Sequence, residues 1–154
     1  MSAAVNPLGI HHITAMAGDA QANLDFYTRV LGLRLVKRTV NFDDPGTYHL
    51  YFGDYDGAPG TLLTFFPWGA KSLRGRIGTG QVTATAFSIP SASVSYWVDR
   101  LKRLDIATQA PFERFDDAVV SLRDRDGVVL ELVAESAADT RPGWSVGDVP
   151  EQHS

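Results

Sequence analysis

The sequence predicts an α+β fold in which the chain runs twice through the order strand, helix, strand, strand, strand. Segments with strand-like alternation of apolar and polar residues occur both before and after the glycine-rich stretch "GAKSLRGRIGTG". One segment with helical spacing follows the first strand of each set, and the distances between equivalent elements match. We therefore expect tandem βαβββ modules, with the boundaries 1–68 (first module), 69–80 (linker), 81–135 (second module) and 136–154 (C-terminal tail).

In the first module, "HITAMA" is the predicted first strand and "AQANLDFYTRVLG" the predicted helix. Asp19 is the expected N-cap, because its carboxylate can accept hydrogen bonds from free N–H groups of the first turn. Gly32 can end the helix in a left-handed conformation, and Leu24, Tyr27 and Leu31 share one helix face. The remaining strands are predicted at "LRLVKRTV", "TYHLYFGD" and "GTLLTFFPW", with the turn "YDGAPG" before the last.

The second module repeats this order. "QVTATAFSI" is the predicted first strand, which Pro90 ends, and Ser91 or Ser93 is expected to cap the helix "VSYWVDRLKRL". Strands are predicted at "ATQAPFERF", "DAVVSLRD" and "VVLELVAE", with the turn "RDG" before the last.

The spacing inside each module identifies equivalent positions. His12 and Ala84 each lie seven positions before the expected helix cap (19 − 12 and 91 − 84). Thr64 and Glu131 each lie four positions after a glycine near the start of the last strand (64 − 60 and 131 − 127). His12 is therefore the predicted counterpart of Ala84, and Thr64 that of Glu131.

Composition excludes several classes of partner. The net charge is −4 and the basic residues alternate with acidic ones, as in "DRLKRLD", which argues against a nucleic-acid surface. The absence of cysteine excludes disulfides and thiolate chemistry. "MSAAVNPLGI" lacks the features of a signal peptide, and no apolar run reaches membrane-spanning length. We expect a soluble, cytoplasmic protein without nucleic-acid or membrane partners.

The duplication, with a histidine in its first strand, resembles the vicinal oxygen chelate superfamily, which includes glyoxalase, fosfomycin- and bleomycin-resistance proteins and extradiol dioxygenases. The stretches "GIHHIT", "FYTRVLGLRLVKRTVNFDDPGTYHLYFGD" and "PGTLLTFFPW" are similar to the amino-terminal half of ring-cleaving dioxygenases that act on hydroquinones. The resemblance implies a curled mixed sheet whose first and last strands point side chains into a cup. Those dioxygenases have four modules, and "GWSVGDVPEQHS" resembles the linker between their second and third.

The resemblance implies a divalent metal, Fe(II) or Mn(II), and makes His12 one of its ligands. A non-haem Fe(II) site of this kind needs two histidines and one carboxylate. At the four equivalent positions, His12 and Glu131 are the candidate metal ligands, Ala84 cannot ligate, and Thr64 is a weak oxygen donor at best. The resemblance implies that two further ligands come from the last module of the longer proteins. A hydrogen-bonded core histidine and a solvent-facing glutamate are the alternative interpretations.

Strand alternation predicts that His11 and His12 leave opposite faces and do not chelate one ion. The resemblance implies that His11 is a catalytic residue for proton transfer at the substrate hydroxyl and that Thr14 lies in the pocket. His49 could face the same pocket, as could Thr64 and Ala84. A structural hydrogen bond for His11 and simple packing for His49 remain alternatives, and His153, in the tail, is expected to have no role.

Aromatic residues of the later strands could line a pocket for an aromatic ring. Period-2 alternation instead predicts that about half of them pack in the core. These residues are Tyr51, Phe52, Phe65, Phe66 and Trp68.

The main functional hypothesis is a metal-dependent, extradiol-type ring-cleaving dioxygenase, or a half-length relative of one, acting on a hydroquinone-like aromatic. The alternatives are a metal-free dimeric binding or resistance module for a small aromatic, and a glyoxalase-type lyase or isomerase. A homodimer that exchanges modules would bring His12 of one chain near Glu131 of the other. A partner chain with two further modules would supply the missing ligands instead.

Overall fold

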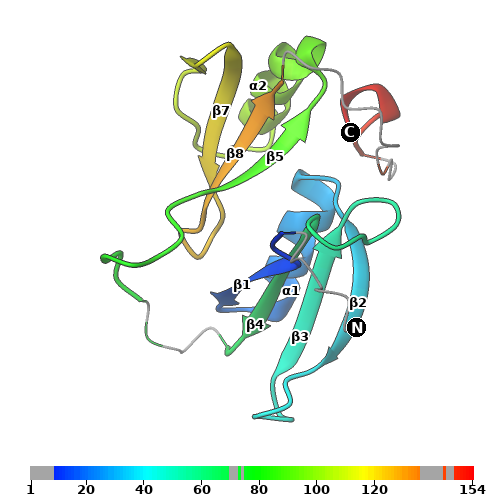
Figure 1. The fold of residues 1–154 in the computed structure, drawn as a ribbon, viewed down its shortest axis with the longest axis vertical. Helices are drawn as coiled ribbons and strands as arrows, with labels where there is room; N and C mark the ends of the chain where they lie inside the picture. The colour runs from blue at the N-terminus through cyan, green and yellow to red at the C-terminus, as the bar shows by residue number, and fades with distance from the viewer. Residues whose placement is uncertain (1–8, 70–72, 74, 136–143, 145–147) are drawn as a thin grey trace, which may run out of the picture.

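The computed structural model describes residues 9–69, 73, 75–135, 144 and 148–154. Its elements follow the predicted order in both halves (Figure 1). The first module comprises β1 (His12–Ala17), α1 (Ala20–Asp25), the π-helix η1 (Phe26–Val30), β2 (Arg34–Val40), β3 (Tyr48–Gly53) and β4 (Leu62–Pro67). The second comprises β5 (Thr85–Ile89), the 3-10 turn η2 (Ser91–Ser93), α2 (Val94–Arg103), β6 (Phe112–Arg114), β7 (Asp117–Arg123) and β8 (Val129–Ala134), and the 3-10 turn η3 (Glu151–His153) follows. Parts of the predicted linker (70–72 and 74) and tail (136–143 and 145–147) lie outside the described residues.

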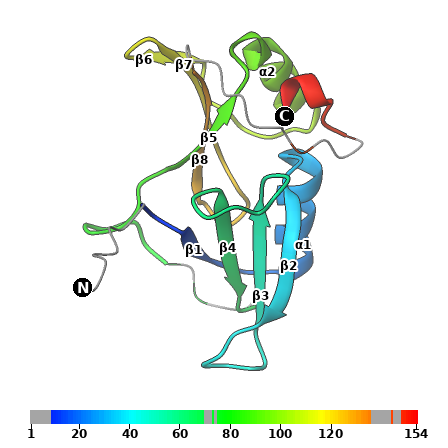
Figure 2. The same cartoon turned by 45° about the vertical axis from the view of Figure 1, so that its right-hand side comes forward.

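Each module forms one four-stranded mixed sheet. The strand orders are β1-β4-β3-β2 and β5-β8-β7-β6, and in each sheet the first strand runs parallel to the last while the other pairs are antiparallel. The two sheets lie one above the other rather than closing into one (Figures 1 and 2). The tandem βαβββ fold is thus confirmed. β5 and β6 are the strands most shortened relative to the prediction, because β5 starts at Thr85 and β6 spans three residues.

The strand registers relate the two modules directly. Thr14 on β1 lies opposite Thr64 on β4, and Ala86 on β5 lies opposite Glu131 on β8. The offset between the first strands is therefore 72 (86 − 14), which equals the offset between positions 12 and 84 (84 − 12). The equivalences read from the sequence spacing match the pairing of the strands.

The first helix begins as predicted but changes pitch. The Asp19 carboxylate accepts a hydrogen bond of 2.8 Å from the backbone N–H of Ala22, and Gly32 has the left-handed φ of 74°. Between them α1 gives way at Phe26 to the π-helix η1, where a continuous α-helix was predicted. The wider π turn buries the consecutive rings of Phe26 and Tyr27.

The second helix has one of the two predicted residues, Ser93, at its N-cap, but the predicted capping bond is not formed in the part of the chain that the structure describes. Ser91 lies inside the turn η2, and Ser93, at the N-cap of α2, makes no capping bond among the described residues. The Ser93 hydroxyl instead lies 2.9 Å from Nδ1 of His153, because η3 packs against this end of the helix. The His153 ring also stacks on the Tyr96 ring, with the centroids 4.0 Å apart. The backbone carbonyl of His153 accepts a hydrogen bond from the Trp97 indole. His153 therefore has a structural role that the sequence did not predict.

One hydrophobic core extends through both modules. The Tyr27 ring packs between Phe52 and Phe65, with centroid distances of 5.1 and 4.6 Å. The second module contributes Trp97 and Leu132 to the same cluster. Among the described residues, no helix is long and apolar enough to cross a membrane.

Candidate functional site

The face of the first sheet that its helix leaves uncovered carries most of the candidate residues. Phe52 and Phe65 contact Tyr27 of η1, so strand alternation turns Tyr51 and Thr64 to the opposite side. Thr14 shares this side because it pairs with Thr64. We call this surface the helix-free face, and its residues on β1, β3 and β4 are His12, Thr14, Met16, His49, Tyr51, Leu62, Thr64 and Phe66.

Four side chains of the helix-free face form a continuous hydrogen-bond chain. Oγ1 of Thr14 lies 2.9 Å from Oγ1 of Thr64, which lies 3.0 Å from Nε2 of His49. Nδ1 of His49 lies 3.0 Å from the hydroxyl of Tyr51. Thr64 and His49 are buried, whereas Thr14 is exposed and Tyr51 half-buried. The structure thus brings together three predicted pocket residues, Thr14, His49 and Thr64, and adds Tyr51.

The surroundings of His49 disfavour its protonated form. Burial lowers the pKa of its imidazole, and the nearby charges of His12 and Lys37 lower it further. The ring packs between Tyr51 and Phe66, with centroid distances of 4.2 and 4.1 Å. A neutral imidazole has one nitrogen that donates and one that accepts, so His49 can link two hydroxyls of opposite polarity.

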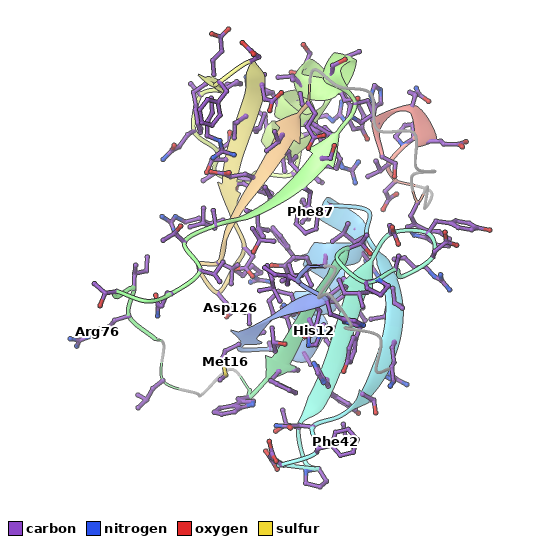
Figure 3. All side chains as sticks on the ribbon, in the orientation of Figure 1. His12, Met16, Phe42, Arg76, Phe87 and Asp126 are labelled. Atoms are coloured by element: carbon purple, nitrogen blue, oxygen red, sulfur yellow. The ribbon has the colours of Figure 1, made fainter. Side chains whose placement is uncertain are left out.

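His11 and His12 point toward each other, which corrects the prediction that they leave opposite faces. Their Nδ1 atoms lie 3.0 Å apart, and the rings meet edge to face. Alternation fails because β1 begins at His12, so His11 lies before the strand, where its carbonyl accepts a hydrogen bond from Gly60. Both residues are exposed, and the His12 ring lies 6.4 Å from the Tyr51 ring. Figure 3 labels His12 on the first sheet.

Glu131 lies apart from this group, in the second sheet. Its carboxylate forms an ion pair of 2.8 Å with the guanidinium of Arg114 on β6. The Glu131 side chain is 13% exposed and that of Arg114 43%, so the pair lies at the edge of the solvent. No feature of the local sequence indicated this partner, because the contact depends on the register of the short strand β6.

A cavity of about 770 Å³ lies between the modules and has the size of a small-molecule pocket. It is lined by residues of both first strands, so it brings His12 and Ala84 to one space. Its other lining residues include Ile10, Leu62, Phe87, Trp97 and Leu132. The other candidate site residues lie outside this lining: the catalytic candidate His11, the pocket candidates Thr14, His49 and Thr64, and the metal-ligand candidate Glu131.

A divalent metal needs at least three protein ligands here, and the described residues do not supply them together. In that part of the chain, no three histidine, aspartate or glutamate side chains converge. His12 is exposed, but Glu131 is engaged by Arg114, Ala84 has no donor atom, and Thr64 is already hydrogen-bonded. The donor set around His12 therefore does not fit a complete three-ligand site within this chain.

The chain is similar to several curated proteins of Bacillus subtilis (strain 168). It is 49% identical over 142 residues to "Putative ring-cleaving dioxygenase MhqO" and 55% identical over 137 residues to "Putative ring-cleaving dioxygenase MhqE". It is also 35% identical over 146 residues to "Chlorohydroquinone/hydroquinone 1,2-dioxygenase" of Sphingobium indicum. These matches cover 92%, 89% and 94% of this chain but 45%, 44% and 46% of the relatives, so the chain spans about half their length.

Solved structures show the same fold. A crystal structure of a "putative dioxygenase" from Bacillus subtilis superposes with a TM-score of 0.87 at 46% identity, covering 95% of this chain and 46% of the other. The fosfomycin resistance protein FosX of Listeria monocytogenes superposes with a TM-score of 0.63 at 20% identity, covering 85% and 93% of the two chains. Residues 9–132 match the family described as "Glyoxalase/Bleomycin resistance protein/Dioxygenase superfamily". With its tandem βαβββ modules, the chain belongs to this superfamily.

Proposed function

We propose that this chain contributes one half of a metal-dependent ring-cleaving dioxygenase site that takes a hydroquinone-like aromatic. The observation that carries the proposal is the helix-free face of the first sheet, where an exposed His12 lies beside hydroxyl groups and aromatic rings. Relatives at 38% to 55% identity are named as ring-cleaving dioxygenases, and one at 35% identity is named as a hydroquinone dioxygenase. The rings of Tyr51 and Phe66 give this face an aromatic surface against which a phenolic ring would pack.

His12 is the proposed metal ligand of the first module and Glu131 that of the second. Fe(II) or Mn(II), when bound, would bind the substrate hydroxyl oxygens and polarise them. His11 is the proposed proton acceptor at the substrate, since its ring contacts His12 and is exposed. The proposed pocket residues are Thr14, His49, Thr64 and Ala84.

A second pair of modules would complete the site. β1, which carries His12, is an edge strand, and its neighbouring apolar side chains Ile10 and Met16 are 71% and 59% exposed. A homodimer with exchanged modules would place His12 of one chain beside Glu131 of the other. A partner chain with two further modules would supply a second histidine as well. We place this assembly in the cytoplasm.

A metal-free binding module is the second candidate function. The observation in its favour is the ion pair between Arg114 and Glu131, which occupies the carboxylate that a metal would need. Such a module would bind a small aromatic without converting it.

Metal content, native mass and oxygen uptake on the purified protein, with hydroquinone as the probe, separate the two candidates. For the dioxygenase, we expect Fe(II) or Mn(II) to bind to an assembly of at least two module pairs, and His12→Ala to abolish binding of the metal. Phe42→Ala, at a fully exposed position outside the helix-free face, is the control and should leave metal binding intact. Hydroquinone binding by the parent protein without metal or oxygen uptake, and with unchanged affinity in the double variant His12→Ala/Glu131→Gln, would reject the dioxygenase in favour of the binding module.

A further inference from the structure

The hydrogen-bond chain of the helix-free face begins and ends at hydroxyls that can reach a ligand. Its inner members, Thr64 and His49, are buried, while Thr14 and Tyr51 reach the surface on either side. Thr14 lies two residues from His12 on the same face of β1, and the Tyr51 ring lies 6.4 Å from the His12 ring. Thr14 and Tyr51, the outer members of the hydrogen-bond chain, therefore flank the space beside His12 in which a small molecule would bind.

Each of the four side chains can both donate and accept a hydrogen bond. The hydrogen-bond chain therefore has two states, which differ in the direction of every bond. In the first state, Nδ1 of His49 carries the hydrogen and donates to Tyr51, while Thr64 donates to Nε2 and Thr14 donates to Thr64. In the second state, Nε2 carries the hydrogen and every bond is reversed. The two outer hydroxyls consequently have opposite polarity in both states, since one offers its hydrogen to a ligand when the other offers a lone pair.

We propose that the Thr14–Thr64–His49–Tyr51 chain is a proton relay, whose two ends act on two oxygens of a ligand bound beside His12. The ligand class is a compound with one oxygen that gives up a proton and a second that receives one, such as a hydroxylated aromatic passing through a keto form. The identity of the ligand rests on the proposed function, whereas the relay itself rests on the hydrogen bonds. Tyr51 is then a catalytic residue. His49 and Thr64 hold it in position and connect it to Thr14 at the other end of the relay.

The relay step conserves protons and electrons. A proton leaves a ligand hydroxyl for Oγ1 of Thr14, the Thr14 hydrogen passes to Thr64, and the Thr64 hydrogen passes to Nε2 of His49. The hydrogen on Nδ1 passes to the Tyr51 oxygen, and Tyr51 releases its own hydrogen to the second ligand oxygen or to water. For each O–H or N–H bond that breaks, one forms, and reverse transfer through water resets the chain. Neutral His49 suits this role because it carries one ring hydrogen in both states.

The relay can be tested without turnover, by nitrogen NMR of the histidine-labelled full chain. In Thr14→Val, Thr64 loses its outer partner, so its hydrogen goes to Nε2 and His49 adopts the Nδ1–H tautomer. In Tyr51→Phe, Nδ1 loses its partner, so the hydrogen stays on Nε2 and bonds to Thr64. The expected result is opposite tautomers in the two variants, although Thr14 contacts His49 only through Thr64. Tyr48→Phe, an exposed position of the same strand, is the control and should give the parent spectrum.

The same His49 tautomer in both variants would overturn the relay. It would also be overturned if the parent protein has the Nε2–H tautomer and Thr14→Val leaves that tautomer unchanged. If Thr14→Val does not fold, Thr14→Ala removes the same hydroxyl at an exposed position and serves in its place.

The second test uses oxygen uptake by the assembled protein with hydroquinone. We expect Tyr51→Phe to lower kcat by about 100-fold while KM changes by less than about threefold, because general acid–base groups contribute on this scale. Unchanged kcat in a protein that turns over hydroquinone would overturn the relay. Opposite tautomers in an assembled, metal-loaded protein that takes up no oxygen with hydroquinone would leave the relay standing and reject the proposed function.

Discussion

Tyr27 in the first module donates its hydroxyl hydrogen to Oδ2 of Asp124 in the second, 97 positions further along the chain. The O···O distance is 2.9 Å and both groups are buried. Burial raises the pKa of the tyrosine hydroxyl, and the Asp124 charge raises it further, so Tyr27 remains the donor. Asp124 also accepts the backbone N–H groups of Asp126 and Val128, and Asp126 accepts a hydrogen bond from Gly18 of the first module (Figure 3). This turn therefore fixes the two modules relative to each other.

Tyr27→Phe should destabilise the protein by about 1–3 kcal/mol, because a buried carboxylate loses a hydrogen bond while the ring keeps its packing. Urea unfolding measures the change. Tyr55→Phe, at an exposed tyrosine, is the control and should change stability by less than about 0.5 kcal/mol. Equal midpoints for the two variants would show that the Tyr27 hydroxyl does not stabilise the junction.

Asp124→Asn should remove a pH dependence of stability. Burial, as the largest cause, raises the pKa of the Asp124 carboxyl above its ordinary value of 3.8, although its hydrogen bonds act in the opposite direction. The folded state therefore binds this proton more tightly than the unfolded state. The contribution of Asp124 to the free energy of unfolding rises as pH falls through the raised pKa, and it is complete below the ordinary value. Asparagine does not titrate, so unfolding of both proteins from pH 7 to pH 4 should show the parent gaining stability relative to the variant. A constant difference across this range would contradict the assigned shift.

The sequence predicted those features of the fold that depend on local chemistry. The Asp19 cap and the Gly32 terminus follow from side chains that satisfy or permit a nearby backbone conformation. The cap at Ser93 failed because a distant segment, η3, binds its hydroxyl. The orientation of His11 failed because a strand boundary one residue away cancels the alternation. Boundaries and distant contacts are set by tertiary packing, which a pattern in one segment does not contain.

The candidate site divides in the same way. Thr14, His49 and Thr64 could be grouped because alternation and the internal duplication assign each of them to a face. Tyr51 carried the same signal, two positions after His49 on one strand, but its aromatic ring suggested packing. The ion pair of Glu131 could not be predicted, because it joins positions on β6 and β8 that are not neighbouring strands in the sheet.

Arg100→Lys should weaken the contact between α2 and the first module. The Arg100 guanidinium is buried and donates hydrogen bonds to the backbone carbonyls of Arg29, Val30 and Asp148, so it satisfies the end of η1. Lysine retains the charge but cannot make this set of planar contacts, and a loss of about 2 kcal/mol is expected. Arg103→Lys, on the exposed side of the same helix, is the control for urea unfolding. A variant as stable as this control would mean that the three carbonyls find other partners.

Arg114→Gln should strengthen metal binding if Glu131 is a ligand. The Arg114 guanidinium occupies the Glu131 carboxylate at 2.8 Å, so a metal ion has to displace it. Because Arg114 is 43% exposed, water screens the pair, and its removal is worth about 0.5–1 kcal/mol, or about two- to fivefold in Kd. Titration of the assembled protein with Mn(II), followed by electron paramagnetic resonance, measures the change, and Glu131→Gln should weaken the same binding. Arg103→Gln removes an exposed charge away from Glu131 and controls for the change in net charge. If Arg114→Gln and Arg103→Gln shift the affinity equally, the ion pair does not compete with the metal, and Glu131 acts as a structural partner of β6 rather than as a ligand.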